Sequence, residues 1–190
     1  KKQRKKQRQN QKKKTKATEA IKDGLEGLAK QIMSYTTKDT YSLVQPYLNE
    51  NVKTKEEAIE GASYIIAEWI SDNAYFRKWI RRVALSEGII STKRKKNASD
   101  DNKLYEMYYD FSEKVKYAKE YRIMAINRAE KEKVISVTIC VDDEKIMNFL
   151  KEKTIKKEGP FNYVIKDAIE DSYKRLIFPS IEREIRGELT

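Results

Sequence analysis

Apolar side chains recur at intervals of three and four residues through most of this 190-residue sequence. The clearest stripe lies between residues 54 and 72, where a helix would align Ala58, Ile59, Ala62, Ile65, Ile66, Trp69 and Ile70. Only three prolines and six glycines occur, too few for the many turns of a sandwich or barrel. The sequence therefore predicts a mainly α fold, built as a multi-helical array.

A second stripe follows the first closely and predicts a helical hairpin. Its apolar positions are Phe76, Trp79, Ile80, Val83 and Ala84. Thr54 and Glu57 form a capping box at the start of the first helix, and Gly88 is expected to end the second. Two amphipathic helices joined by a turn of three or four residues are typical of a helix-turn-helix, although an ordinary αα-hairpin has the same pattern.

Shorter helices are predicted on both sides of this hairpin. Asp23–Gly24 should divide the apolar stretch at 20–33 into two short helices, and another helix should lie near residues 40–48. Further helices are expected from Ser112 to about Glu130, after a cap at Asp142 or Asp143, and through the stripe at 161–177. Pro179 should break or kink that last helix.

One short β element is predicted at residues 134–141, a run rich in β-branched side chains. Its partner inside the chain would be residues 88–93 or the tyrosine-rich segment 104–111, and a partner outside the sequence is the alternative. Cys140 lies in this run and is expected to be a buried, small hydrophobic residue. A single cysteine excludes an internal disulfide, which fits a reducing, cytoplasmic setting.

The net charge of +11 is concentrated in a basic tail. Residues 1–16 hold ten Lys or Arg and no acid, which leaves 31 basic and 30 acidic residues for the rest of the chain. Such a block repels itself and suits a phosphate backbone or an anionic surface, while a solvated linker is the alternative. We therefore expect a disordered or linker tail at 1–16 and a helical domain at 17–190.

Residues that carry chemistry are scarce. The sequence has no histidine, no glycine-rich phosphate loop, no cysteine pair and no calcium-loop pattern. It also lacks an apolar run of the roughly 18 residues needed to span a membrane. We therefore expect a cytoplasmic, non-enzymatic protein without metal, cofactor, small-molecule substrate or membrane attachment.

Several segments, in order, resemble the amino-terminal half of the Tex family of bacterial transcription accessory proteins. They read KTKAT at 14–18, GLEGLA at 24–29, YEMYYDFSE at 105–113, RIMAINRAEKE at 122–132 and PSIEREIR at 179–186. The sequence departs from the family pattern at Gly27, at Glu120–Tyr121 and at Ala129. The resemblance implies the helical, helix-turn-helix-containing part of a larger protein, cut before a ribonuclease-H-like domain. A carboxy-terminal OB-fold RNA-binding domain would follow further downstream.

Together these features predict a non-catalytic, RNA- or DNA-binding scaffold in transcription. The candidate contacts are Lys12, Lys13, Lys14 and Lys16 in the tail, with a second patch beside the hairpin formed by Arg77, Lys78, Arg81, Arg82, Lys93, Arg94, Lys95 and Lys96. The alternative is a protein-interaction module that docks onto RNA polymerase or ribosome-associated proteins.

Overall fold

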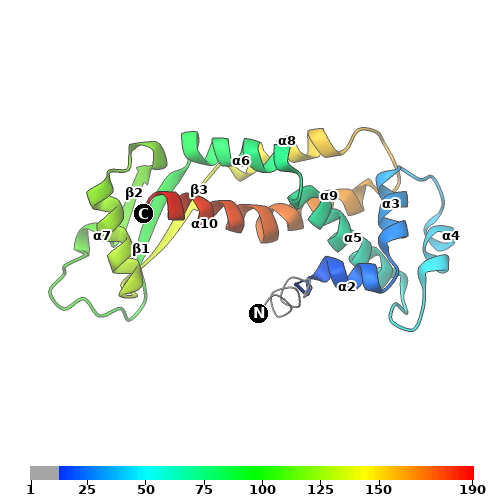
Figure 1. Ribbon diagram of the computed structural model, residues 1–190, viewed down its shortest axis with the longest axis horizontal. Coiled ribbons are helices and arrows are strands. Elements are labelled where there is room, and N and C mark those ends of the chain that lie inside the picture. The colour runs from blue at the N-terminus through cyan, green and yellow to red at the C-terminus, as the bar shows by residue number, and fades with distance from the viewer. Residues whose placement is uncertain (1–12) are drawn as a thin grey trace, which may run out of the picture. The chain divides into compact units, whose positions relative to one another are not determined.

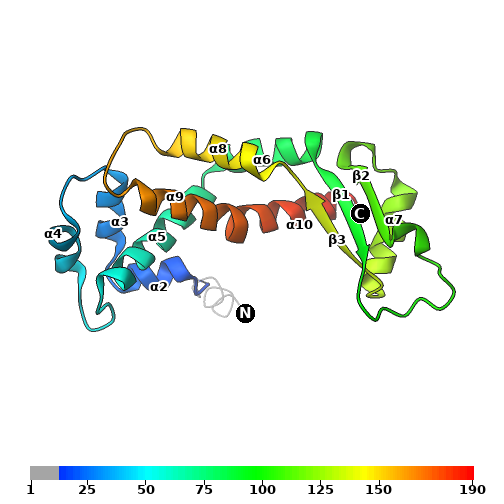
Figure 2. The same ribbon diagram turned by 180° about the vertical axis from the view of Figure 1, so that it is seen from behind.

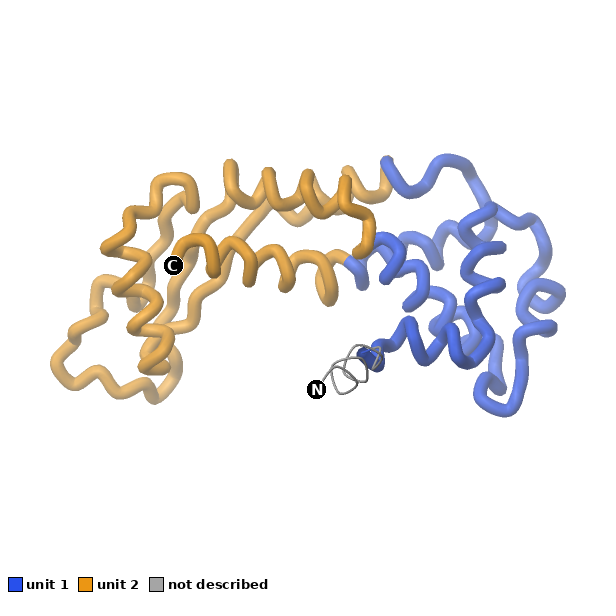
Figure 3. Tube along the Cα trace, in the orientation of Figure 1, with its two compact units in different colours: residues 1–70, 153–172 blue, residues 71–152, 173–190 orange. Residues whose placement is uncertain are grey.

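A computed structural model describes residues 13–190 and divides the chain into two compact units (Figure 3). Unit 1 comprises Lys1–Ile70, described from residue 13 onward, together with Lys153–Ser172. Unit 2 comprises Ser71–Glu152 and Tyr173–Thr190. The predicted tail lies largely outside the described residues, so its boundary at residue 17 stays a prediction. Among the described residues no helix is long and apolar enough to cross a bilayer.

In unit 1, every regular element among the described residues is a helix, and loops connect the helices (Figure 1). Its elements are α2 (Lys16–Lys22), α3 (Glu26–Met33), α4 (Thr40–Val44), the 3-10 helix η1 (Gln45–Tyr47), α5 (Lys55–Ser71) and α9 (Asn162–Asp171). Gly24 adopts φ +88° and separates α2 from α3, as predicted. Leu28, Ile32, Ile66, Ile165 and Ile169 are almost completely buried and form part of its core.

Unit 2 combines helices with a sheet. Its elements are α6 (Ala74–Glu87), β1 (Ile89–Arg94), η2 (Glu106–Tyr108), β2 (Asp110–Lys114), η3 (Val115–Tyr117), α7 (Glu120–Lys131), β3 (Ile135–Cys140), α8 (Asp143–Thr154) as far as Glu152, and α10 (Phe178–Glu188). A π-helical stretch, η4 (Ser172–Ile177), precedes α10. Pro179 therefore lies in the first turn of a helix, where its missing N–H is not needed.

The sheet is larger than the single β element that the sequence predicts. Its order is β2-β1-β3 and both pairings are antiparallel. The predicted strand at 134–141 is confirmed as β3, and its partner is the predicted segment 88–93. The helix predicted to start at Ser112 is wrong there, because residues 110–114 pair with β1 and the helix begins only at Glu120.

The two faces of the sheet have different surroundings. One face carries Ile90, Thr92, Ile139 and Glu113, and α7 covers it, with Arg122 Nη1 2.5 Å from Glu113 Oε1. The side chains of the other face point away from α7. Cys140 belongs to that outward face and is exposed, so its predicted burial is wrong. The period-2 alternation of a strand, rather than the apolar character of its neighbours, decides where this thiol lies.

α10 contacts the edge strand β3 of this sheet. Ile139 donates its backbone N–H to Glu182 Oε2 at 2.9 Å, and Arg186 Nη2 lies 2.9 Å from Glu130 Oε1 of α7. The last helix of the chain therefore completes unit 2.

The two helices of the predicted hairpin are confirmed as α5 and α6. Glu57 donates its backbone N–H to Thr54 Oγ1 at 3.2 Å, and Gly88 follows the last residue of α6, as predicted. The helices belong to different compact units, however. The helix-turn-helix arrangement therefore stays a prediction.

Candidate nucleic-acid interface

The four basic residues of α6 have two different environments. Arg77 donates to the Ser71 carbonyl oxygen at 3.1 Å and to Ser180 Oγ at 2.6 Å. Arg81 lies 3.7 Å from Glu184 and forms a second, shorter ion pair with Glu188. Both arginines therefore bind groups of unit 2 itself. Lys78 and Arg82 are exposed.

The basic run at the end of β1 supplies three exposed ammonium groups, those of Lys93, Lys95 and Lys96. Arg94 differs from them, because its guanidinium lies 4.7 Å from the centre of the Tyr109 ring and donates to the Ala98 carbonyl oxygen at 3.1 Å. Arg94 therefore helps to hold the β1–β2 connection, and its lysine neighbours project from that connection.

Asp100 holds the β1–β2 connection together by hydrogen bonds. Its carboxylate accepts hydrogen bonds from the backbone N–H groups of Leu104 (3.0 Å) and Tyr105 (2.9 Å) and from the Tyr109 hydroxyl (2.7 Å). The Tyr109 hydrogen bond, above all, lowers the pKa of Asp100, and the same bond raises the pKa of Tyr109. The basic run therefore starts an ordered connection.

A fourth exposed lysine, Lys133, follows α7, and no local sequence pattern points to it. It adopts φ +62°, and the next residue, Val134, accepts a hydrogen bond from the Lys95 N–H at 2.9 Å. The exposed Lys133 side chain therefore starts beside Lys95. We call Lys93, Lys95, Lys96 and Lys133 the lysine cluster. Only the pairing of β1 with β3, which joins segments about forty residues apart, reveals its fourth member.

The predicted second patch beside the hairpin does not form one continuous basic surface in unit 2. Gly88 links the end of α6 to the start of β1, and β1 then runs away from α6 to the lysine cluster (Figures 1 and 2). Lys78 and Arg82 therefore lie at the opposite end of β1 from Lys95 and Lys96.

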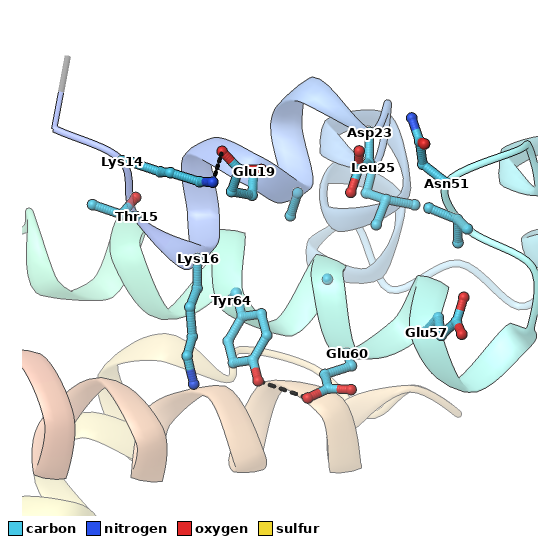
Figure 4. A pocket seen from close by; sticks show the side chains of 13 residues that line it. Lys14, Thr15, Lys16, Glu19, Asp23, Leu25, Asn51, Glu57, Glu60 and Tyr64 are labelled. Atoms are coloured by element: carbon cyan, nitrogen blue, oxygen red, sulfur yellow. Dashed lines mark hydrogen bonds and ion pairs between the residues drawn. The ribbon is translucent and has the colours of Figure 1, made fainter. Parts of the chain in front are cut away.

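The described tail residues belong to unit 1. Lys12 lies outside the described residues, and Lys13 is exposed. Lys14 Nζ is 3.8 Å from Glu19, and Lys16 Nζ lies 4.8 Å above the centre of the Tyr64 ring. Lys14 and Lys16 line a cavity of about 560 Å³ that also contains the carboxylates of Glu19, Asp23, Glu57 and Glu60 (Figure 4). Acidic groups therefore surround these two lysines.

Charge is distributed unequally between the units. Unit 2 holds 22 basic and 17 acidic residues, whereas the described part of unit 1 holds 12 basic and 13 acidic residues. The near-neutral body expected from the sequence is thus an average over a basic unit and a slightly acidic one.

No group of three or more Cys, Asp or Glu side chains within residues 13–190 is arranged to hold a metal ion.

Replacing Asp100 with alanine is expected to release the β1–β2 connection, because three hydrogen bonds lose their acceptor. Hydrogen exchange of the Leu104 and Tyr105 amides should accelerate strongly, whereas Asp101→Ala, which removes an exposed neighbour, should leave it nearly unchanged. The lowered pKa of Asp100 sets the pH dependence. The ionised Asp100 carboxylate stabilises the folded connection at pH values above the usual pKa of 3.8. This stabilisation is lost as the pH falls through the lower pKa of the folded state. Protection that fails well above pH 3.8 would contradict this assignment.

Comparison with known proteins gives consistent matches. A family model described as Tex central region-like matches residues 35–190. The uncharacterized protein YdcI of Bacillus subtilis (strain 168) is 44% identical over 185 residues, which cover 95% of this chain and 26% of that protein. The transcriptional accessory protein Tex of Neisseria gonorrhoeae is 26% identical, over 94% of this chain and 24% of that protein.

A human protein named S1 RNA-binding domain-containing protein 1 is 27% identical over 192 residues, which cover 93% of this chain and 19% of that protein. The chain thus spans about a quarter, or less, of the length of these relatives.

Proposed function

Since the chain belongs to the Tex central region-like family, we propose that it is a non-catalytic, nucleic-acid-binding part of a transcription accessory factor. One relative is named as a transcriptional accessory protein and another as an S1 RNA-binding domain-containing protein, which supports a role on nucleic acid. The absence of histidine from the sequence favours a role without catalysis. A cytoplasmic location goes with this proposal.

The lysine cluster is the observation that carries the proposal. Its four lysines are exposed and start from neighbouring backbone at one end of a sheet, in the unit that carries a net positive charge. Lysines that neutralise phosphates release condensed counterions, and this release drives sequence-independent binding. Because Asp100 and Arg94 order the connection, little additional ordering is needed when phosphate binds.

The variant K93Q/K95Q/K96Q is expected to weaken binding and to flatten its salt dependence. The slope of log K against log salt should fall by roughly two to three, since each lost phosphate contact removes about 0.7 to 0.9. Fluorescence anisotropy with labelled RNA and DNA, on chains with and without residues 1–16, provides the measurement.

The matched control is K22Q/K38Q/K53Q, which removes three exposed lysines of unit 1. Equal losses in the two variants would show that total charge, not the cluster, determines affinity. A parent chain that binds neither RNA nor DNA at about 50 mM salt would refute the proposed function.

A second candidate function is protein docking, which an exposed ridge on unit 2 favours. Tyr117, Tyr121 and Met124 are 62%, 60% and 60% exposed along η3 and α7. Tyrosine and methionine are enriched in the centres of protein interfaces. RNA polymerase and ribosome-associated proteins are the expected partners. Capture of either that survives nuclease treatment and is lost in Y121S/M124S would favour this function.

A further inference from the structure

Within residues 13–190, no element covers one of the two faces of the sheet of unit 2. Antiparallel register places directly paired residues on the same face, and the outward triplets are 89, 91 and 93 on β1, 110, 112 and 114 on β2, and 136, 138 and 140 on β3. Eight of these nine side chains are exposed, and Ser91 on the central strand is half-buried. We call this surface the open sheet face.

Short hydroxyl side chains occupy the middle of the open sheet face. Ser91 lies between its paired residues Ser112 and Thr138, and Ser136 follows on β3, where its hydroxyl donates to the Lys93 carbonyl oxygen at 3.4 Å. Hydroxyl groups of this kind commonly donate hydrogen bonds to phosphate oxygens. Because the side chains are short, they form a low surface that a wide, stiff ligand can approach.

Two lysines mark the ends of this face. Lys93 is paired with Asp110 and Ser136 at one end, and Lys114 is paired with Ile89 at the other. Four residues of extended chain separate the two positions, or about 13 Å along the strands. Lys93 also belongs to the lysine cluster, so the basic surface continues from the cluster onto the sheet. Asp110 is the one carboxylate among the nine outward residues.

None of the nine outward residues is aromatic. Surfaces that bind single strands stack the unpaired bases on aromatic side chains, and the open sheet face offers no ring for this purpose. A duplex keeps its bases stacked internally and presents phosphates, which match lysines and hydroxyls. The exposed tyrosines of unit 2, at positions 75, 117 and 121, lie on α6, η3 and α7 and not on the strands of the open sheet face.

We propose that the open sheet face, together with the lysine cluster, binds the phosphate backbone of double-stranded nucleic acid without reading its sequence. This inference rests on the proposed function and narrows it to a substrate class. Duplex RNA and duplex DNA share the chemistry that the face recognises.

The test compares 20-base-pair duplex RNA, duplex DNA and the corresponding single strands by anisotropy with the full 190-residue chain. The variant S112E/T138E places two carboxylates on the open sheet face and should weaken duplex binding by at least about tenfold, because they would face phosphates. The control S34E/T37E adds the same charge to exposed positions of unit 1 and should change affinity little. Thermal unfolding checks that each variant is folded.

A second variant gives the opposite sign. D110N removes the carboxylate from the face and should strengthen duplex binding by roughly twofold to fivefold, which a misfolded protein could not do. Single-strand binding as tight as duplex binding, or unchanged duplex affinity in both S112E/T138E and D110N, would overturn the inference and leave the lysine-cluster proposal standing. Loss of all nucleic-acid binding in the parent chain would instead refute the proposed function itself. A difference in affinity between duplex RNA and duplex DNA would show which of the two the chain prefers to bind.

Discussion

Replacing Gly88 with alanine is expected to lower the free energy of unfolding of unit 2 by about 3 kcal/mol. A Cβ atom at this position would overlap the carbonyl oxygen of Ala84, which accepts the Gly88 N–H at 3.0 Å. Backbone cannot rotate away as a side chain can, so the junction between α6 and β1 must shift. That shift would also strain the 2.9 Å hydrogen bond from the Val115 N–H to the Gly88 carbonyl oxygen.

The same substitution at Gly187 provides a control of opposite sign. No atom of residues 13–190 lies within 4 Å of a Cβ there, and the residue is in α10, where alanine is favoured over glycine by about 0.5 to 1 kcal/mol. Urea unfolding in a W69F background measures both variants. Trp79 is then the single tryptophan, and it lies in unit 2, stacked 3.7 Å from Phe149. A G88A protein as stable as its parent would contradict the steric argument.

Replacing Tyr173 with alanine is expected to lower the free energy of unfolding of unit 2 by about 3 to 5 kcal/mol. The side chain is only 2% exposed, packs near Phe178, and donates its hydroxyl to Asp143 Oδ1 at 2.5 Å. Truncation would leave a cavity beside an existing hollow of about 270 Å³ that Tyr173 lines. The milder Y173F keeps the ring and loses only the hydrogen bond, which should cost about 1 kcal/mol.

Alkaline pH separates the two contributions of Tyr173. Burial, and then the Asp143 carboxylate, raise the pKa of its hydroxyl above the usual 10.0. The contribution of the Tyr173 hydroxyl to the free energy of unfolding is therefore fully present below pH 10. It declines at higher pH, where the unfolded chain loses the proton that the folded chain keeps. The stability difference between the parent and Y173F should shrink above pH 10. A difference that stays constant would contradict the raised pKa.

Local signals predicted the helices well. The stripe of α5, its Thr54 cap and the glycines at 24 and 88 act over a few residues, and the structure confirms each of them. β2 was missed because its five residues, Asp-Phe-Ser-Glu-Lys, lack β-branched side chains and include a good helix-capping serine. Its inward Glu113 pairs with Arg122, a partner that the sequence of the strand alone does not reveal.

Local sequence explains the surroundings of only some of the candidate site residues, and their binding role stays a prediction. Lys93, Lys95 and Lys96 are exposed, as a basic run suggests, but Arg77 and Arg81 bind Ser180, Glu184 and Glu188, about a hundred residues away in the sequence. Such partners depend on how α10 packs against α6, which no local pattern encodes. Lys133 was missed for the same reason, since strand pairing brings it to Lys95.

Each compact unit is assembled from two separate stretches of the chain, which has a consequence for synthesis on the ribosome. All 82 residues of Ser71–Glu152 emerge before the stretch Lys153–Ser172 that completes unit 1. Unit 2 must in turn wait for Tyr173–Thr190, and until then the N–H of Ile139 lacks the Glu182 carboxylate that covers it. An unpaired strand edge is a template for pairing with another chain. A nascent chain that stalls before α10 would therefore expose the edge of β3 to neighbouring nascent chains.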